Sequence, residues 1–596
     1  MSEEAFMKRT ATCGSLRSTD EGSTVVLNGW VHRDRNHGAL HFINLRDRYG
    51  LTQVVVDDDA SLELQAIATE LKLEYCIAVK GIVRKRPDEM INPDMPTGEI
   101  EVKAEKIEIL STAPTLPFMI DEENNAREDL RLKYRFLDLR CFGMQKRIQL
   151  RHEIIKAIRE YFYKTNFYEI ETPTLIRSTP EGARDFVVPS RIYPGKFFAL
   201  PQSPQLYKQL LMVSGFDKYF QIARCYRDED PRGDRQLEFT QLDVEMSFVT
   251  REDVLSLMED LFGNVFKSVL NVELPPSFKR LTYHDAMNTY GCDKPDLRFG
   301  LEMKEASFAA KSTFTAFTDI LANKGSVKYV VAPKTDNFDY TRKYLTSLEE
   351  AAKIYGAKSL AWMKVQDGKL SGGVSKYFSE IEAEVLAETQ AKDGDVILLI
   401  GHENWKKCCN SLGAIRSKLG QDLNLIQPGY AFCWIIDFPL FEYNEDAGHW
   451  EAAHHMFSMP QVEYLDTLES DPGSVKGDLY DLVLNGYELA SGSIRIHDIE
   501  LQKRIFRICN YPDDKAQEAF GFLLDAFKFS PPPHGGIAPG IDRLCMIVAQ
   551  QSSIKEVIAF PKNTAALSPM DNCPAYIDQS QLDELKLKFD APEQKN

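Results

Sequence analysis

Short runs of alternating apolar and polar positions dominate the N-terminal part of the chain. These runs cover 25–31, 40–48 and 51–56, and a helical pattern at 62–71 separates them from two further runs at 75–83 and 100–110. Alternation with a period of two places one face of a β-strand in a core. Five strands with a helix between the third and the fourth follow the order of an OB barrel, a frequent platform for single-stranded nucleic acid. We therefore predict an OB-fold domain at 1–112.

Prolines and polar residues mark a linker at 113–145, and a helical period begins after it. Strand-rich sequence occupies 146–300 and 428–596, whereas helix and strand patterns alternate between 301 and 427. The middle stretch carries little clustered chemistry, so we interpret it as an inserted α/β domain that splits a larger one. The chain is predicted to be an α+β multidomain protein. Apolar residues at the start of the larger domain share one helix face: Leu150, Ile154, Ile158 and Phe162.

Composition is that of an ordinary soluble protein, and it excludes several classes. With 596 residues, 43% of them hydrophobic and 27% charged, the chain is too long for one core. No apolar run is long enough to cross a bilayer, and the polar segment 1–10 does not resemble a signal peptide. The eleven cysteines are odd in number and contain no C-x-x-C pair, which favours free thiols over disulfides or zinc. We expect a cytoplasmic protein with no membrane contact.

The net charge of −18 argues against a protein that coats nucleic acid indiscriminately. A local basic run is nevertheless present, because 127–151 contains eight Lys and Arg against three acidic residues. Two interpretations stay open for this run. It could face phosphates, or it could be a solvated helical connector, which is the commoner meaning of such a run.

The common ATP motifs, G-x-x-x-x-G-K-[ST] and G-x-G-x-x-G, are missing, so three other segments are candidates for holding phosphates. The first, 219–245, has apolar alternation on both sides of a charged tip and is predicted to be a long hairpin. The second, 481–497, carries Asp481 and Glu488. Seven residues separate these two carboxylates, so a regular strand would place them on opposite faces, and joint metal binding needs a bulge or bend near Gly486.

The third segment, 535–543, is rich in glycine and leads into a helix. Glycines before a helix allow a close approach of the backbone to a ligand. Arg543 stands in the first helical turn, where the helix dipole favours acids over bases. A bound polyanion would reverse that penalty.

Together the three segments resemble the motifs of class II aminoacyl-tRNA synthetases. Helix 147–166 with strand 167–173 is similar to motif 1, the R-D-E hairpin to motif 2 and G-I-D-R to motif 3. Finer matches resemble the bacterial-type aspartyl-tRNA synthetases, and the stretch 301–427 resembles the GAD insertion of that family. The matching segments are T-P-E-G-A-R-D at 179–185, P-Q-S-P-Q-L-Y-K at 201–208, G-C-D-K-P-D-L-R at 291–298 and A-F-P-K at 559–562.

The resemblance implies a fold, partners and a reaction. It implies an antiparallel catalytic sheet of six or seven strands flanked by helices, a homodimer formed through motif 1, and an OB domain that binds the anticodon. The implied enzyme is an aspartate–tRNA ligase: L-aspartate and ATP give aspartyl-adenylate and pyrophosphate, and aspartate then passes to the 3′-terminal adenosine of tRNA(Asp). Because the attacking carboxylate is already ionised at neutral pH, no general base is required for activation.

The resemblance also assigns nucleotide roles. Arg227 would contact the α-phosphate and the aspartate α-carboxylate, and Arg543 would lie against adenine and reach the γ-phosphate, with Phe239 on the other face of the base. Arg227, Arg543 and Glu488 are the predicted catalytic residues, and Asp481 and Glu488 would hold Mg²⁺, a hard cation suited to carboxylates. The further ATP-binding candidates are Asp228, Glu229, Gln236, Gly540, Ile541 and Asp542.

Specificity for aspartate would come from cations. Lys208 and Arg495 would pair with the side-chain carboxylate of the substrate, and Glu181 and Asp243 would take its α-ammonium group or orient their neighbours. Asparagine would leave buried cations unpaired. Arg227 also belongs to this pocket, and its wall would be completed by Gln205, His454 and His455.

On the tRNA side, Phe42 would stack on an anticodon base, as aromatic residues do on single-stranded RNA. The positions that would contact base edges are Arg33, Gln53 and Glu101. His37 lies in the first loop of the predicted OB domain, where members of the family with relaxed specificity tend to carry histidine. Charging of tRNA(Asn) as a second tRNA is therefore a hypothesis.

Three alternative functions make different demands on the sequence. The asparaginyl and lysyl enzymes share the layout, but the insertion and the Lys208/Arg495 pair argue against both. A non-catalytic tRNA-binding paralogue should have lost Arg227, Arg543 or Glu488, and all three are present. A plain OB protein that binds single strands would leave most of the chain without a purpose.

Overall fold

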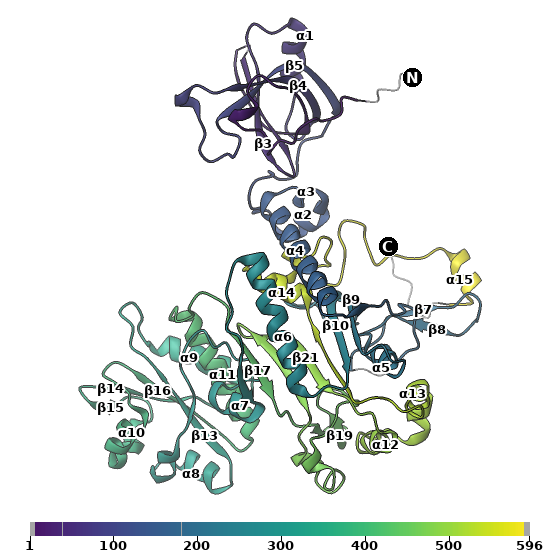
Figure 1. Ribbon diagram of the computed structural model, residues 1–596. Helices are drawn as coiled ribbons and strands as arrows, with labels where there is room; N and C mark the ends of the chain where they lie inside the picture. Colours follow the sequence, from purple (N-terminus) through teal and green to yellow (C-terminus); the bar gives the residue numbers. More distant parts are fainter. Residues whose placement is uncertain (1–5, 39, 180–181, 589–596) are drawn as a thin grey trace. The chain divides into compact units, whose positions relative to one another are not determined.

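The computed structural model describes residues 6–38, 40–179 and 182–588 (Figure 1). The chain forms two compact units. One contains Met1–Gln149 with Lys555–Ala575, and the other contains Leu150–Ile554 with Tyr576–Asn596. The predicted linker 113–145 thus groups with the N-terminal domain, together with a segment from near the C-terminus. Within the described residues, no helix is long and apolar enough to cross a membrane. Each of the eleven cysteines is a free thiol.

The first unit contains a closed five-stranded barrel in the order β1-β2-β3-β5-β4, which confirms the predicted OB-fold. Helix α1, Leu62–Glu70, lies between the third and fourth strands in the sequence. The apolar half of each alternating strand fills the barrel, as Leu27, Ile43 and Val54 do with no exposed surface. The strands are β1 (Thr24–His37), β2 (Leu40–Asp47), β3 (Gly50–Val56), β4 (Cys76–Lys85) and β5 (Ile100–Ser111).

The basic run after the barrel forms helices α2 (Glu128–Lys133) and α3 (Arg135–Asp138) and the start of α4 (Phe142–Lys164). Arg131 pairs with Asp138 at 3.0 Å and with Glu556 at 2.8 Å. The buried Arg135 donates hydrogen bonds to the main-chain carbonyls of residues 555, 558 and 559. Arg131 and Arg135 therefore attach the segment 555–559 to the connector helices. These two arginines face protein groups, and not a phosphate or solvent as the two interpretations of the basic run propose.

The second unit is built on an eight-stranded sheet in the order β11-β17-β20-β21-β22-β10-β9-β6. Its six central strands are antiparallel, but β6 and β11 add parallel strands at the two edges. The expected antiparallel sheet of six or seven strands is corrected accordingly. Short segments entering from helical connections, and not from hairpins, form both edges, which permits the parallel direction. The strands are β6 (Tyr168–Glu169), β9 (Lys218–Tyr226), β10 (Glu238–Ser247), β11 (Lys279–Thr282), β17 (Phe432–Ile436), β20 (Leu479–Leu484), β21 (Tyr487–Ile494) and β22 (His534–Pro539).

Helices flank this sheet, as the fold class requires. Apolar side chains of α5, α12 and α13 meet in one cluster around Phe506 and Phe520, whose rings stack 5.3 Å apart. Helix α14 follows β22 directly, and its Ile541 and Leu544 are buried. The helices are α5 (Gln205–Val213), α6 (Arg251–Val265), α7 (Tyr283–Tyr290), α12 (Ile499–Ile508), α13 (Asp513–Phe527) and α14 (Ile541–Val548).

The stretch between the two halves of the sheet has a five-stranded sheet of its own, in the order β12-β13-β16-β14-β15. In β16 (Val396–His402), Ile397 and Leu399 join one apolar core, and Leu398 and Ile400 join another. Both faces of the strand are thus covered, which explains its continuous apolar run. The other elements are β12 (Lys304–Glu305), α8 (Thr315–Ala322), β13 (Ser326–Ala332), α9 (Arg342–Lys353), β14 (Ala361–Gln366), β15 (Lys369–Ser371), α10 (Glu382–Thr389) and α11 (Trp405–Asp422).

Candidate active site

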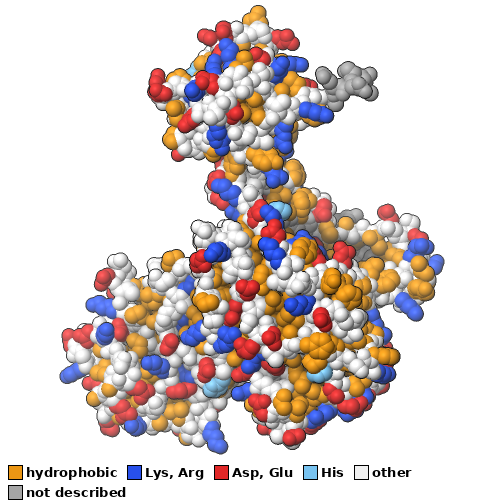
Figure 2. Space-filling model, viewed as in Figure 1, with side chains coloured by type: hydrophobic (Ala, Val, Ile, Leu, Met, Phe, Trp, Pro, Cys, Tyr) orange, Lys and Arg blue, Asp and Glu red, His pale blue; other side chains and the backbone are white. Residues whose placement is uncertain are grey.

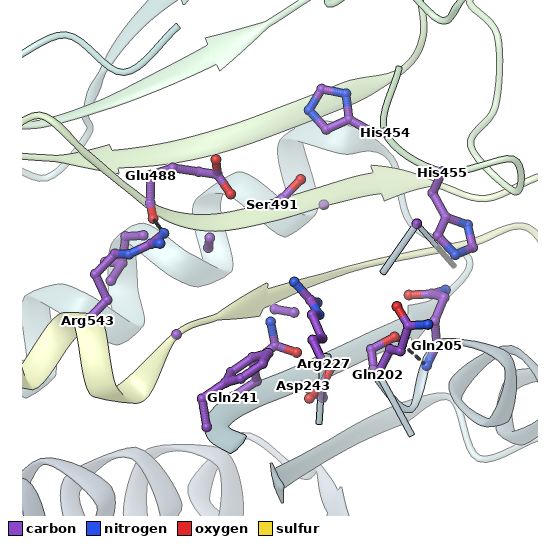
Figure 3. A pocket seen from close by; sticks show the side chains of 18 of the residues that line it. Gln202, Gln205, Arg227, Gln241, Asp243, His454, His455, Glu488, Ser491 and Arg543 are labelled. Carbon is purple, nitrogen blue, oxygen red and sulfur yellow. Dashed lines mark hydrogen bonds between the residues drawn. The ribbon is translucent and has the colours of Figure 1, made fainter. Parts of the chain in front are cut away.

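A cleft of about 630 Å³ lies on the large sheet, and most of the predicted site residues line it (Figure 3). Alternation along β10 directs Phe239, Gln241, Asp243 and Glu245 to the same face of the sheet. Figure 3 shows two ends of the cleft, with Arg543 and Glu488 at one and His455 and the glutamines 202 and 205 at the other. The predicted residues that line the cleft are Gln205, Lys208, Arg227, Glu229, Gln236, Phe239, Asp243, His454, His455, Glu488, Arg495, Gly540, Asp542 and Arg543.

One end of the cleft holds two buried cations among two buried carboxylates. The Lys208 ammonium lies 2.7 Å from Asp243 and 3.9 Å from Glu245. The Arg495 guanidinium donates to Glu245 at 2.9 Å and to the Ser493 hydroxyl at 2.7 Å. Burial raises the pKa of Asp243, and Lys208 opposes that rise. Because isolated charges are costly to bury, the cations and carboxylates stabilise one another as one network.

Two adjacent histidines close this end, and their pKa values shift in opposite directions. Burial lowers the pKa of His455 to about 3, helped by Arg495, Lys208 and Arg227. Burial also acts against the charged form of His454, but Asp481, 3.4 Å away, raises the pKa of that imidazole overall. His455 is therefore neutral and lies beside the cations Lys208 and Arg495, whereas His454 lies next to the carboxylate of Asp481.

The lowered pKa of His455 predicts a pH effect on stability. The folded protein resists protonation at this site, while the unfolded chain takes up a proton near the ordinary pKa of 6.5, so stability falls as the pH drops from 6.5 toward about 3. Wild type should lose about 1 kcal/mol more than His455→Asn between pH 6.5 and 5.5. Urea unfolding of both proteins across this range measures the difference. Parallel pH curves would show that His455 is not buried in neutral form.

Two arginines line the rest of the cleft, Arg227 in the middle and Arg543 at the other end. The Arg227 guanidinium lies 5.0 Å from the centre of the Phe239 ring. Arg543 donates to the main-chain carbonyl of Glu488 and pairs with Asp234 at 3.2 Å. Both guanidinium groups therefore have defined positions along the same cleft, where their positive charges suit a polyanion.

Asp542 attaches the G-I-D-R segment at 540–543 to the neighbouring strand β10. The carboxylate of Asp542 accepts a hydrogen bond from the main-chain N–H of Thr240 at 2.7 Å and pairs with Arg151 of α4. Since Asp542 is 3% exposed, its charge serves this attachment. The attachment fixes where Arg543, the next residue, enters the cleft.

Asp481 and Glu488 can bind a metal jointly only if the chain bends near Gly486. The structure has this bend. Asn485 and Gly486 both have positive φ, +52° and +85°, and form the tight turn between β20 and β21. In this hairpin Val483 lies opposite Glu488, so Asp481, two residues earlier, shares a face with Glu488. Burial and then the neighbouring Asp481 raise the pKa of Glu488.

The oxygens of this acidic pair fit Mg²⁺. One carboxylate oxygen of Asp481, Oδ1, is buried without a hydrogen-bond partner. No group of three or more His, Cys, Asp and Glu is placed to hold a metal ion in the described part of the chain. Mg²⁺ commonly takes only one or two carboxylates and completes its shell with water and substrate phosphates.

Three predicted active-site residues in the described part of the chain do not line the cleft: Asp228, Asp481 and Ile541. Asp481 lies 3.4 Å from His454, which does line it. Asp228 points instead toward Arg184, 3.7 Å away, and does not line the cavity. The Ile541 side chain is fully buried in the α14 core, so only its backbone could approach a ligand. Glu181 lies outside the described residues. Asp228 is therefore better explained as an anchor for the segment that carries Arg184.

The structure adds cleft residues that the sequence did not single out. Glu245 is fully buried and holds Arg495, and its position two residues after Asp243 on a strand was the available signal. Lys294 enters from the loop 291–298, which resembles the family segment but carried no predicted site residue. Further lining residues include Gln202, Gln241 and Ser491.

In the barrel, the predicted anticodon residues share the outer face. Asn44 lies opposite both Arg33 and Gln53 in the strand register, and Phe42 is two residues from Asn44. Gln53 donates to Glu101 at 2.9 Å. Both signs of charge are interspersed on the barrel face seen in Figure 2. This arrangement offers one partly exposed aromatic ring beside polar groups, as single-strand readers do.

The rings of His37 and Phe42 are neighbours on the same part of the barrel. Their centroids are 6.3 Å apart, and the planes meet edge to face. His37 is exposed at the end of β1. A group at this position can therefore touch whatever stacks on Phe42.

The OB barrel, the antiparallel sheet and the cleft with its two arginines define a class II synthetase. The chain belongs to this family: residues 127–564 match "tRNA synthetases class II (D, K and N)", and residues 25–110 match "OB-fold nucleic acid binding domain". Among curated relatives, it is 61% identical to "Aspartate--tRNA(Asp/Asn) ligase" of Treponema denticola, over 98% of this chain and 99% of that one. It is 49% identical to the protein of the same name in Borreliella burgdorferi, over 98% of this chain and 99% of that one.

Solved structures agree with the fold. The asparaginyl-tRNA synthetase of Pyrococcus horikoshii, solved with asparaginyl-adenylate, superposes with a TM-score of 0.59 at 19% identity, covering 95% of this chain and 100% of that one. A putative aspartyl-tRNA synthetase from Leishmania major gives 0.59 at 20% identity, covering 94% of this chain and 96% of that one. At these identities the likeness concerns the fold.

Proposed function

We propose that this chain is an aspartate–tRNA ligase, which activates L-aspartate with ATP and esterifies the 3′-terminal adenosine of tRNA(Asp). The observation that carries the proposal is the buried network of Lys208 and Arg495, which lies in the same cleft as Arg227 and Arg543. Two cations at one end suit a carboxylate side chain, and two arginines toward the other suit a polyphosphate. The names of the curated relatives support the same activity.

In the activation step, an oxygen of the aspartate α-carboxylate attacks the α-phosphorus of ATP. A new C–O–P linkage forms while the bond to the β-phosphate breaks, and pyrophosphate leaves. Arg227 would neutralise the charge that the two anions bring together, and Arg543 would orient the nucleotide. In the second step, a ribose hydroxyl of the tRNA attacks the carbonyl carbon, and AMP leaves with the electron pair of the broken bond.

Asp481 and Glu488 are proposed to hold Mg²⁺. When bound there, the ion would supply positive charge to the phosphates. The two carboxylates would otherwise repel the triphosphate, so this part of the site requires a cation in addition to Arg543.

Discrimination against asparagine follows from the buried charges. Aspartate brings one more negative charge than asparagine to a site where Lys208 and Arg495 are within 1% and 5% of full burial. The neutral amide would replace a charge-assisted pair with a weaker contact and would set an NH₂ donor against cationic donors. A homodimer formed through 147–173, and binding of the anticodon by Arg33, Phe42, Gln53 and Glu101, complete the proposal.

Aspartate-dependent exchange of pyrophosphate into ATP tests the proposal directly. Aspartate should support exchange, whereas asparagine and lysine should not. Exchange with lysine or asparagine in place of aspartate would refute the substrate. A chain that binds tRNA but exchanges with no amino acid would be the non-catalytic paralogue.

Charging of tRNA(Asn) as a second tRNA is part of the proposal, because the relatives carry "Asp/Asn" in their names and His37 lies beside Phe42. His37→Leu should lower kcat/KM for tRNA(Asn) about 10-fold while that for tRNA(Asp) changes less than about 2-fold, since one lost contact to a base costs roughly 1–3 kcal/mol. Aminoacylation of the two purified tRNAs by wild type and variant measures the ratio. Equal losses on both tRNAs would contradict a role in discrimination.

A further inference from the structure

Lys294 is a cation of the cleft without an assigned role. It lies on the loop 291–298 between α7 and the inserted domain, and it lines the cleft. Its ammonium is exposed, and no carboxylate of the described residues forms an ion pair with it. The positive charges of Lys294 and Arg543 both act on Glu488. A lysine with free donors beside the acidic pair is placed where the far phosphates of ATP would lie.

The loop that carries Lys294 is fixed against the acidic hairpin. Asp296 pairs with Arg298 at 2.7 Å, which stiffens the loop. Gly486, in the turn that precedes Glu488, packs on Asp296, because a Cβ at Gly486 would lie only 3.2 Å from the Asp296 Cβ. The contact between Asp296 and Gly486 therefore fixes the position of the Lys294 loop relative to the turn before Glu488.

The inserted domain supplies the clamp for the far end of this loop. Arg416 of α11 is 1% exposed and donates to the main-chain carbonyls of Asp296, Phe299, Gly300 and Leu301 at 3.0–3.1 Å. Its guanidinium carbon also lies 4.1 Å from the centre of the Phe299 ring. The buried guanidinium directs its donors to four main-chain carbonyls within 296–301. It therefore fixes the backbone of this segment rather than another side chain.

The contact between helix and loop is close at a second point. A Cβ on Gly413 of α11 would lie 2.6 Å from the carbonyl oxygen of Gly291, and one on Gly291 would lie 2.5 Å from the Gly413 Cα. Both positions therefore require glycine. Helix α11 thus holds the loop at its start through Gly413 and at its end through Arg416.

We propose that Lys294 binds the β- and γ-phosphates of ATP, and the pyrophosphate formed from them, and that Arg416 of the inserted domain is the positioning residue that holds Lys294 there. This inference rests on the proposed function and adds a role for the inserted domain, which would brace the pyrophosphate end of the cleft. Lysine suits this task because its ammonium is a compact charge on a long stem that can follow the phosphates as pyrophosphate leaves.

Ligand binding to the full-length protein tests the role of Lys294. Calorimetric titrations with ATP, AMP and inorganic pyrophosphate, all with Mg²⁺, separate the far phosphates from the rest of the nucleotide. Lys294→Ala should bind ATP and pyrophosphate about 10-fold more weakly, as expected for one lost charge-assisted contact, while AMP binding changes less than about 2-fold. Lys294→Arg should recover most of the loss. Lys304→Ala, at an exposed lysine of the inserted domain, is the matched control and should match wild type.

Exchange kinetics give a second readout. For Lys294→Ala, KM for pyrophosphate and ATP should rise about 10-fold while KM for aspartate stays unchanged. Unchanged ATP and pyrophosphate affinity in Lys294→Ala, or an equal loss of AMP affinity, would overturn the inference. Absence of exchange in wild type would instead refute the proposed function, and the binding titrations would still decide the role of Lys294.

The role of Arg416 is tested by comparing pyrophosphate binding by the single variants and the double variant at positions 294 and 416. Arg416→Met should weaken pyrophosphate binding as Lys294→Ala does, and the double variant should be no weaker than Lys294→Ala alone, because both changes remove the same contact. Arg416→Lys, which keeps the positive charge but lacks the planar guanidinium, should lie between wild type and Arg416→Met. AMP binding near the wild-type value shows that the cleft is intact. Additive losses, or a loss that includes AMP, would contradict the positioning role, and Arg416→Lys serves if Arg416→Met does not fold.

Discussion

Arg227→Ala is expected to lower kcat/KM for aspartate-dependent ATP–pyrophosphate exchange roughly 10³-fold, the scale on which removal of one preorganised donor acts. Arg227 lies between the two ends of the cleft, where the attacking carboxylate and the α-phosphate would meet (Figure 3). Two anions must come together in that region, so the lost charge acts on the transition state more than on either substrate alone. Initial rates of exchange at varied aspartate and ATP measure the effect.

A matched control separates this effect from a general loss of charge. Arg507→Ala removes an exposed arginine that pairs at 2.6 Å with the equally exposed Asp513 on the surface of the same unit. Exchange by this variant should stay within about 2-fold of wild type, because exposed ion pairs contribute little. If Arg227→Ala retained more than about a tenth of the wild-type rate, the assignment of Arg227 would be wrong.

Arg495→Gln is expected to abolish use of aspartate and also to destabilise the second unit. The change removes a cation that would pair with the substrate, and it leaves the fully buried Glu245 with only Lys208, 3.9 Å away. Breaking a buried ion pair on one side costs about 3–5 kcal/mol. The melting midpoint should therefore fall, and kcat/KM for aspartate should drop at least about 10³-fold.

A second substitution distinguishes the two effects of this change. Glu245→Gln in the Arg495→Gln background removes the unpaired charge and places two amides where the ion pair was. Most of the lost thermal stability should return, while aspartate-dependent exchange should stay near background. Recovery of exchange together with stability would show that Arg495 acts only by supporting the fold, and the specificity assignment would fail.

Most of the fold could be predicted from local patterns. Alternation with a period of two identified the barrel strands and the long hairpin at 219–245. These patterns are read within one element, so they need no knowledge of its neighbours. The four-residue β11 was missed because it is too short for any period to appear, and the strand expected at 167–173 is reduced to the two residues of β6.

The basic run at 127–151 shows the limit of such patterns. Charge density alone favoured either phosphates or solvent, yet the partners of Arg131 and Arg135 come from 555–559, more than 400 residues away. Composition carries no information on a partner at that separation. The R-D-E pattern likewise does not indicate the partner of Asp228. That partner, Arg184, comes from another loop and is brought near by packing.

By itself, the sequence determined which chemical groups are present and the elements that carry them: Asp243 and Glu245 on one face of a strand, Asp481 and Glu488 on a hairpin, and Arg543 at the start of a helix. Only the tertiary structure decided which of these groups share a cleft and which charges are already paired. It placed Glu245 behind Arg495 and brought Lys294 to the acidic hairpin through Arg416 of the inserted domain. The physical reason is that periodicity and turn chemistry act over a few residues, whereas burial and charge pairing depend on whichever distant segments the packed core brings together.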